Sequence, residues 1–253
     1  MTCADHPGRV ALVTGAGRGI GKATALLLAE RGFRVMATAR SEDELSRLGL
    51  DFVTGDVSVP ADCERVVAST RERLEPISVL VNNAGFGSAA EREIWQQDID
   101  AWRRTLAVNL DGPFYLCRAA VADMVEQGYG RCVFVSSTAG VVSEARMTAY
   151  GASKAGLLGL MRGVAQDAGP HGVTSNAVLP GWVRTEMAER SARDEAERRG
   201  IEAEQIWAER AATYPPGRVV TPHEVAETIA FLCSDAASGI NGEQITVALG
   251  STW

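Results

Sequence analysis

The sequence predicts an α/β protein built on one mostly parallel sheet with helices on both faces, the arrangement called doubly wound. Short apolar segments rich in β-branched residues alternate with longer helical segments along the chain. The segment CVFV at residues 132–135 has no polar residue, which is typical of a strand buried on both faces. A glycine-rich loop, TGAGRGIG at residues 14–21, separates the first predicted strand from the first predicted helix.

The predicted elements follow one another in a regular order. Strands are expected at residues 10–13, 34–39, around 52, 77–81, 132–135, 173–179 and 244–248. Helices are expected at residues 22–31, 42–48, 61–74, 98–110, 114–126, in the segment that carries Tyr150, and at 223–233. Gly32 is expected to end the first helix. No domain-sized linker or repeat interrupts this order, so residues 1–253 are predicted to form a single domain.

The composition is that of an ordinary soluble globular protein, with 46% hydrophobic and 23% charged residues. The net charge of −7 argues weakly against nucleic-acid or membrane binding, because phosphate surfaces recruit basic patches. No apolar run approaches the ~20 residues of a membrane span, and residues 1–8 do not resemble a signal peptide. We therefore expect a cytoplasmic protein that binds a small molecule, with no nucleic acid or membrane as a partner.

The cysteines favour the same compartment. Five of them are scattered at positions 3, 63, 117, 132 and 233, with no C-x-x-C pair. This pattern is typical of a reduced cytosolic protein, so we expect neither disulfides nor a metal site.

One segment interrupts the alternation of strands and helices. Residues 184–210 are charged and helix-prone without a strand, and Pro215-Pro216-Gly217 ends the segment. It is either a solvated pair of surface helices or a mobile cover over a site. The cover, at about residues 184–216, is favoured because the segment directly follows the carboxyl end of the strand predicted at 173–179, the edge where open α/β sheets bind ligands.

Tyr150 and Lys154 are four residues apart, so on a helix they lie on the same face. A phenol titrates near ~10, and a neighbouring ammonium group favours the phenolate and lowers its pKa toward the range of a general acid or base. Ser137 follows the strand predicted at 132–135, where its hydroxyl can hydrogen-bond a substrate oxygen. Taken alone, this pair is more simply a solvated tyrosine and lysine; the rest of the chain favours a catalytic site.

The glycine loop at residues 14–21 predicts a dinucleotide site, because it lies between a strand and a helix. Glycines allow the backbone to approach a pyrophosphate, and the following helix presents N–H donors and the positive end of its dipole. The competing interpretation is a Walker phosphate loop. That loop requires glycine at position 16 and serine or threonine at position 23, and both residues are alanine.

The end of the second predicted strand indicates which dinucleotide binds. NAD(H) favours an acidic residue there to accept from the ribose hydroxyls, but position 39 is Ala39. Arg40 and Arg18 are placed to meet the 2′-phosphate of NADP(H). NADP(H) is therefore the predicted cofactor, with NAD(H) retained as a second option. Glu42 and Asp43 lie just beyond and can neutralise Arg40, which is otherwise an ordinary surface arginine.

The chain resembles the short-chain dehydrogenase/reductase family over essentially its whole length. The motifs that carry the resemblance are Thr14-Gly15-x-x-x-Gly19-x-Gly21, Asp56-Val57, Asn82-Asn83-Ala84-Gly85, Asn109, Ser137, Tyr150-x-x-x-Lys154 and Pro180-Gly181. The resemblance implies a single dinucleotide-binding and catalytic domain of the Rossmann type. It also implies hydride transfer between a nicotinamide and the carbon of a ketone or secondary alcohol, and a homotetramer or homodimer.

The resemblance also implies a role for each motif residue. Tyr150 is the acid/base, Lys154 lowers its pKa and holds the nicotinamide ribose, Ser137 orients the reacting oxygen, and Asn109 positions a proton-relay water. The residues implied in cofactor binding are Gly15, Gly17, Arg18, Gly19, Ile20, Gly21, Arg40, Asp56, Val57, Asn83, Ala84, Gly85, Tyr150, Lys154, Pro180, Gly181, Val183 and Thr185.

Within the family, the pattern is nearest to 3-oxoacyl and polyketide ketoreductases and to 3-hydroxybutyrate dehydrogenases. The latter have a similar cover, but where they place polar groups for a carboxylate this chain has Ala139 and Met147. The likeness to polyketide ketoreductases is closer in SSTAG at residues 136–140, although their glycine-rich turn is here Gly87-Ser88-Ala89. The apolar residues expected near the substrate are Ala139, Val141, Met147, Trp182 and Met187. They favour an apolar, neutral ketone or alcohol.

Two other functions are compatible with the same fold. A non-catalytic nucleotide-binding sensor or scaffold typically lacks the tyrosine or the lysine, and both Tyr150 and Lys154 are present. A sugar-nucleotide epimerase uses similar chemistry but needs a substantial C-terminal substrate domain, for which 253 residues are short. The enzyme is the favoured alternative.

Overall fold

The structure is a computed structural model that describes residues 8–87, 92–142 and 144–251. Cys3 and the predicted turn residues Ser88 and Ala89 lie outside the described residues. The strands are β1 (Val10–Thr14), β2 (Arg34–Ala39), β3 (Asp51–Thr54), β4 (Ile77–Asn82), β5 (Gly130–Val135), β6 (Val173–Pro180) and β7 (Gln244–Val247). The α-helices outside the cover are α1 (Gly19–Glu30), α2 (Glu42–Ser46), α3 (Pro60–Arg73), α4 (Ile99–Leu106), α5 (Gly112–Gln127), α6 (Thr148–Ala168) and α9 (Pro222–Leu232).

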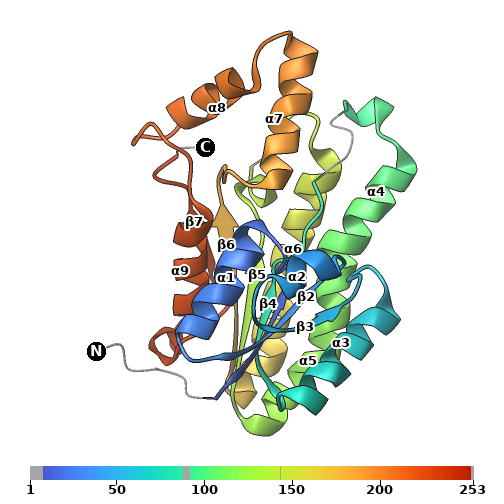
Figure 1. Ribbon diagram of the computed structural model, residues 1–253, viewed down its shortest axis with the longest axis vertical. Coiled ribbons are helices and arrows are strands. Elements are labelled where there is room, and N and C mark those ends of the chain that lie inside the picture. Colours follow the sequence, from blue (N-terminus) through green and yellow to red (C-terminus); the bar gives the residue numbers. More distant parts are fainter. Residues whose placement is uncertain (1–7, 88–91, 143, 252–253) are drawn as a thin grey trace.

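The seven strands form one sheet in the order β3-β2-β1-β4-β5-β6-β7 (Figure 1). Every neighbouring pair is parallel, so the predicted doubly wound fold is confirmed. The strand order reverses between β1 and β4, because β1 continues to β2 on one side and β4 continues to β5 on the other. In open parallel sheets this switch point, at the carboxyl ends of the strands, is where ligands bind.

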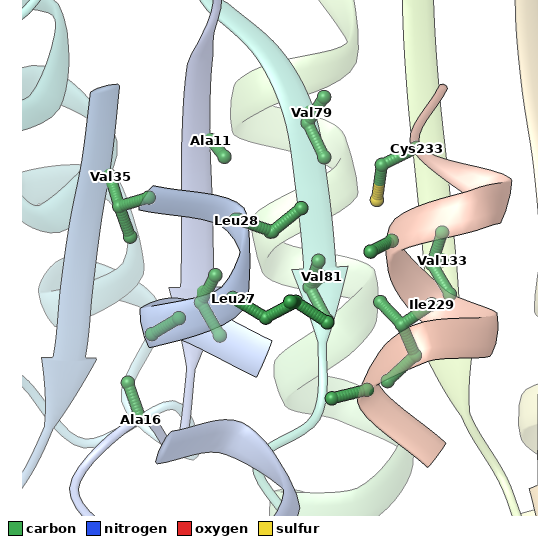
Figure 2. Packing of buried hydrophobic residues seen from close by; sticks show 14 of the residues in the cluster. Ala11, Ala16, Leu27, Leu28, Val35, Val79, Val81, Val133, Ile229 and Cys233 are labelled. Carbon is green, nitrogen blue, oxygen red and sulfur yellow. The ribbon is translucent and has the colours of Figure 1, made fainter. Parts of the chain in front are cut away.

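Helices cover both faces of the sheet (Figure 1). Helices α1 and α9 pack on one face with the first hydrophobic cluster, which contains Leu28 and Ile229. Helices α3, α5 and α6 pack on the other face with a second cluster, which contains Leu116 and Leu157. Figure 2 shows the first cluster, in which side chains of α1 and α9 lie over the strands. Because β1, β2, β4 and β5 contribute apolar side chains to both clusters, their sequences are nearly continuous apolar runs.

Helices α4 and α5 differ from the prediction of two separate helices at residues 98–110 and 114–126. The chain continues from α4 through a π-helical turn at Ala107–Asp111 directly into α5. Pro113 has no backbone N–H to donate, and it lies in the first turn of α5. The π-helical turn contains Asn109, whose side chain is fully buried; such turns occur frequently at functional sites.

The predicted cover consists of two helices, α7 (Glu186–Arg199) and α8 (Ala203–Ala212), that project beyond the carboxyl edge of the sheet (Figure 1). They enclose a small hydrophobic cluster of their own, which contains Ala192, Ile206 and Trp207. Thr185 caps the N-terminus of α7, because its hydroxyl accepts a hydrogen bond from the Ala188 N–H at 3.3 Å. The cover therefore has a fixed internal structure. In the part of the chain that the structure describes, no helix is long and apolar enough to cross a bilayer.

Candidate active site

The end of β5 and the first turns of α6 bring Ser137, Tyr150 and Lys154 together. The hydroxyl of Ser137 is hydrogen-bonded to the phenol of Tyr150, and its Oγ accepts from the Ala139 N–H at 3.1 Å. The Nζ of Lys154 donates to the Val135 carbonyl oxygen at 2.8 Å and lies 5.6 Å from the centroid of the Tyr150 ring. The three side chains predicted from the sequence therefore share one site at the carboxyl edge of the sheet.

The pKa values of this site differ from the expectation for a free tyrosine beside a charged lysine. Burial raises the pKa of Tyr150, the hydrogen bond from Ser137 lowers it, and the charge of Glu144 raises it. Burial also lowers the pKa of the Lys154 ammonium to about 8. The predicted net lowering of the Tyr150 pKa is therefore wrong for the protein without cofactor, in which that pKa is raised. Desolvation dominates, and the ammonium group is directed to the Val135 carbonyl.

Asn109 is buried, and its amide atoms are bonded to two segments of the site. Its Oδ1 accepts from the Phe86 N–H at 2.7 Å, and its Nδ2 donates to the Phe86 carbonyl at 3.0 Å. Nδ2 also donates to the hydroxyl of Ser153 at 2.9 Å. The side chain thus ties the loop after β4 to the helix that carries Tyr150, and its polar atoms are used within the protein.

Ser153 is a residue of the site that the sequence reasoning missed. Its hydroxyl donates to the Tyr150 carbonyl at 2.7 Å while it accepts from Asn109, and the side chain is fully buried. Ser136 has a related position, because its hydroxyl donates to the Lys154 carbonyl at 3.0 Å. A signal was available for Ser153: it lies three positions after Tyr150, so helical spacing places it beside the tyrosine.

The glycine loop and the loop after β4 are bonded directly to each other at the switch point. The hydroxyl of Thr14 accepts from the N–H groups of Asn83 and Ala84, both at 3.0 Å. The Asn83 side chain donates to the carbonyls of Thr14 at 2.8 Å and Gly15 at 3.3 Å. The Asn83 amide therefore fixes the shape of the glycine loop, and its predicted part in cofactor binding stays a prediction.

Three glycines of this loop occupy positions where a side chain would not fit or would strain the backbone. A Cβ at Gly15 would lie 2.9 Å from the Ala84 α-carbon, and a Cβ at Gly21 would collide with the Gly15 carbonyl oxygen. Gly19 has a φ of +55°, a conformation that side chains rarely adopt. Helix α1 begins at Gly19, so its free N–H groups face the carboxyl edge of the sheet. These residues therefore fit a dinucleotide pyrophosphate.

The opposite side of the switch point has a hollow lined by Thr38, Asp56 and Val57 among others. The buried hydroxyl of Thr38 has no hydrogen-bond partner within the described part of the chain. Asp56 Oδ1 accepts from the Ser58 N–H at 2.9 Å and from its hydroxyl at 2.6 Å. Asp56 and Val57 therefore lie together with Thr38 near the end of β2, and their role beside a nucleotide base stays a prediction.

The two arginines predicted to meet a 2′-phosphate each lie beside acidic residues. Arg18 forms ion pairs with Glu44 at 3.4 Å and with Glu186 at 2.9 Å. The side chain of Arg40 is 71% exposed and lies 3.9 Å from Asp56. Glu42 and Asp43 were the acids considered able to neutralise Arg40. Among the described residues, the acid of α2 that forms an ion pair with one of these two arginines is Glu44, and its partner is Arg18.

The segment after β6 connects the sheet to the cover. The Gly181 N–H donates to the Val247 carbonyl at 3.1 Å, and the Trp182 N–H donates to the hydroxyl of Tyr214 at 2.6 Å. Val183 forms a parallel bridge with Val220. A Cβ at Gly19 would lie 3.3 Å from the Thr185 methyl group, so this segment approaches the glycine loop. Thr185 therefore lies beside the glycine loop, while the parts of Pro180, Gly181 and Val183 in cofactor binding stay predictions.

The apolar residues predicted near the substrate have different surroundings. Val141 and Met187 are exposed, and a Cβ at Gly87 would lie 3.3 Å from the Met187 side chain. The cover therefore approaches the loop after β4 at Met187. The ring of Trp182 packs against the guanidinium of Arg210, so this side chain is also part of the cover's support. Ala139 is buried beside Ser137.

Comparisons with known proteins identify the family. A family model described as enoyl-(acyl carrier protein) reductase matches residues 15–252. The 3-oxoacyl-[acyl-carrier-protein] reductase FabG of Escherichia coli is 33% identical over 250 residues, which cover 96% of this chain and 97% of the relative. The cis-4-hydroxycyclohexanecarboxylate dehydrogenase of Sinomonas cyclohexanicum is 38% identical over 256 residues and 96% of both chains.

Solved structures agree with the sequence relatives. A variant of the actinorhodin polyketide ketoreductase with NADPH has a TM-score of 0.90 and 34% identity, covering 99% of this chain and 98% of its own. A xylitol dehydrogenase bound to NAD⁺ has a TM-score of 0.90 and 30% identity, covering 96% and 99%. The chain belongs to the short-chain dehydrogenase/reductase family. It is an NAD(P)-dependent oxidoreductase that acts on C=O and CH–OH groups, so the predicted function is confirmed and the sensor or scaffold is not favoured.

Proposed function

We propose that the protein reduces apolar, neutral ketones to secondary alcohols with NADP(H), using Tyr150 as the proton donor. The observation that carries this proposal is the hydrogen bond between Ser137 and Tyr150 at the carboxyl end of β5, with Lys154 buried beside them. A carbonyl oxygen that binds between the two hydroxyl groups can replace this mutual hydrogen bond with one hydrogen bond from each of them. The relatives whose names specify ketoreductase or 3-oxoacyl reductase activity support the reductive direction.

Each residue has a defined task in this proposal. When bound, the nicotinamide supplies the hydride to the carbonyl carbon. The Ser137 and Tyr150 hydroxyls donate hydrogen bonds to the substrate oxygen, and the Tyr150 proton moves to that oxygen as the alcohol forms. The Lys154 ammonium stabilises the resulting phenolate. The hydrogen bonds of Asn109 to Phe86 and Ser153 hold the loop after β4 against α6. In this position Asn109 would border a proton-relay water.

The cofactor would be held by the residues that border the switch point. The glycine loop and the N-terminus of α1 would hold the pyrophosphate, and Asp56 with Val57 would border the base. The proposed 2′-phosphate ligands are Arg40 and Arg18. The predicted cofactor residues are thus retained as proposals, namely Gly15, Gly17, Arg18, Gly19, Ile20, Gly21, Arg40, Asp56, Val57, Asn83, Ala84, Gly85, Tyr150, Lys154, Pro180, Gly181, Val183 and Thr185.

We also infer a single-domain protein that assembles as a homotetramer or homodimer in the cytoplasm. Support for assembly comes from large apolar side chains on and before α4, since Ile94, Trp95 and Ile99 are all exposed. Support for a reducing compartment comes from Cys63, Cys117, Cys132 and Cys233, which are free thiols. Light scattering behind a sizing column measures the assembly directly, and a monomeric mass at micromolar concentration would contradict it.

The test of the function is the oxidation of NADPH and NADH by the purified protein in the presence of a ketone panel. The panel contains cyclic and linear apolar ketones, 3-oxoacyl thioesters and small keto acids, and the alcohol product is identified by chromatography. We expect turnover with neutral ketones and much weaker turnover with small keto acids. The substrate proposal is wrong if keto acids are the better substrates, and the reductase proposal is wrong if no carbonyl compound is reduced.

A further inference from the structure

Glu44 occupies a special place on the glycine loop. Helix α2 begins after Ser41, whose hydroxyl accepts from the Glu44 N–H at 3.3 Å. The Glu44 side chain lies over Gly17, since a Cβ at Gly17 would lie 2.8 Å from the Glu44 Cβ and would collide with the Glu44 carboxylate. Glu44 therefore leaves no room for a side chain at position 17. The carboxylate of Glu44 lies against the loop that is proposed to hold the cofactor.

Glu44 also shares Arg18 with the cover. One guanidinium nitrogen, Nη1 of Arg18, lies 3.4 Å from Glu44 and 2.9 Å from Glu186. Glu186 is the first residue of α7. The arginine proposed as a phosphate ligand is thus already bonded to one acid from the sheet side and one acid from the cover.

We propose that Glu44 is a specificity-determining residue that opposes the 2′-phosphate of NADP(H) by competing for Arg18. The inference rests on the proposed cofactor site and adds an opposing group to it. A phosphate monoester carries a charge of about −1.5 to −2 at neutral pH. For Arg18 to bind that phosphate, its contact with Glu44 must be weakened or shared, and the two anions then repel each other.

The same carboxylate affects NAD(H) differently. A ribose that lacks the phosphate presents a hydroxyl, which donates a hydrogen bond to a carboxylate and is not repelled by it. Position 39, where the family's acid for this hydroxyl is expected, is Ala39. Glu44 is therefore an acidic group from α2 that lowers the selectivity of the site for NADP(H) without being at the usual strand end.

Two acidic neighbours provide matched controls. Glu42 and Asp43 are on the same short helix and carry the same charge as Glu44. Among the described residues the ion pairs of Arg18 are with Glu44 and Glu186, and that of Arg40 is with Asp56. A general effect of net charge would appear equally in variants of all three acids of α2, whereas direct competition for Arg18 would appear at Glu44 alone.

The experiment measures the dissociation constants of NADPH and NADH by quenching of tryptophan fluorescence, without any substrate. The proteins are the parent, Glu44→Gln, Glu44→Lys, and the control variants Asp43→Asn and Asp43→Lys. We expect Glu44→Gln to increase the preference for NADPH over NADH by roughly three- to tenfold, since a partly exposed ion pair has a modest effect. Glu44→Lys should increase it further, while the Asp43 variants should change it less than about twofold.

The proposal is overturned if Glu44→Gln leaves the NADPH/NADH preference at the parent value or lowers it, or if Asp43→Asn changes it equally. This result differs from a failure of the proposed function. If the parent binds NADH more tightly than NADPH, the proposed cofactor choice is wrong, but the direction of the shift on Glu44→Gln still decides the role of Glu44. Circular dichroism and thermal unfolding of each variant establish that α2 and the glycine loop remain folded.

Discussion

The guanidinium of Arg210 lies 3.6 Å from the centroid of the Trp182 ring. Arg210 is on α8 of the cover and is buried, with 7% exposure; Trp182 directly follows the segment that leaves β6. The same guanidinium donates to Glu195 on α7 at 3.0 Å. One side chain therefore joins both cover helices to the loop that borders the active site, through a cation–π contact and an ion pair.

Replacing Arg210 is expected to loosen the cover. Arg210→Met removes the cation–π contact and leaves Glu195 without this partner, so we expect hydrogen exchange in residues 186–212 to become faster. A loss of about 1–2 kcal/mol in local opening free energy corresponds to roughly five- to thirtyfold in exchange rate. We expect KM for the ketone to rise more than kcat falls, because Arg210 does not contact the reacting atoms.

Arg199→Met is the matched control for Arg210. Arg199 also forms ion pairs within the cover, to Glu195 and Glu209, but its side chain is 42% exposed. Surface pairs contribute little, so exchange in the cover should stay close to that of the parent. Equal exchange in the Arg210 and Arg199 variants would contradict a special role for the buried contact.

Replacing Tyr150 tests the proposed proton donor. Tyr150→Phe keeps the ring and removes the hydroxyl that bonds to Ser137. We expect kcat to fall by roughly 10²–10⁴, with the dissociation constant of the cofactor changed by only a small factor. Tyr129→Phe is the control, since that tyrosine directly precedes β5 and its hydroxyl accepts a hydrogen bond from Arg9, away from the site. Turnover of Tyr150→Phe near the parent value would exclude the proposed mechanism.

Much of the fold was predictable because local patterns and long-range packing agree. The strand at Val173–Pro180 is buried throughout and its sequence is apolar except at three central positions. The spacing of Tyr150 and Lys154 likewise predicted a shared site, because helical periodicity places them on one face. Features that depend only on the local sequence, such as this strand and the shared helix face of Tyr150 and Lys154, were therefore predicted correctly.

Other features depend on contacts between distant segments, which the sequence alone does not reveal. Nothing near Glu44 in the sequence indicates that it meets Arg18, which is 26 positions away. The cover was expected to make few fixed contacts because its sequence is highly charged. In the structure, however, Trp207 and Arg210 of α8 are buried between α8 and its neighbours. The pKa of Tyr150 was also predicted in the wrong direction, since desolvation depends on burial that only the folded chain provides.

The buried lysine predicts a specific dependence of stability on pH in the protein without cofactor. The pKa of Lys154 is lowered to about 8 by burial, below its value in the unfolded chain. Below pH 8 both states are protonated, and the buried charge destabilises the folded state in full. As pH rises above 8, the folded state releases the proton first, so the unfolding free energy increases until the unfolded lysine also titrates.

Denaturant unfolding of the parent and of Lys154→Met measures this effect between pH 7 and pH 10. We expect the unfolding free energy of the parent to rise relative to the variant by roughly 2 kcal/mol between pH 8 and pH 10. The range stops at pH 10 because the raised pKa of Tyr150 acts in the opposite direction above its ordinary value. A constant difference between the two proteins over this range would show that Lys154 has an ordinary pKa in the folded state.

The preference for NADPH over NADH is expected to be moderate, because acidic side chains near the end of β2 nearly balance the charges of Arg18 and Arg40. Arg40 is largely exposed and only 3.9 Å from Asp56, and Arg18 is shared between Glu44 and Glu186. A well-made charge-assisted hydrogen bond contributes roughly 1.5–3 kcal/mol, which solvent and these acids reduce. We therefore expect kcat/KM to favour NADPH over NADH by about one power of ten, the lower end of the range that two free arginines would allow.

The double change Ala39→Asp with Arg40→Ala is expected to reverse this preference. It introduces an acceptor for the ribose hydroxyls at the end of β2 and removes one phosphate ligand, so NADPH meets repulsion where NADH gains a hydrogen bond. The measurement is kcat/KM for both cofactors in the parent, the double variant and Arg47→Ala, which removes an arginine just beyond α2. Arg47→Ala should retain the parent preference. If the parent prefers NADH, the interpretation of this strand end is wrong; if the double change leaves NADPH preferred, the selectivity resides in the glycine loop, with Arg18 as its main determinant.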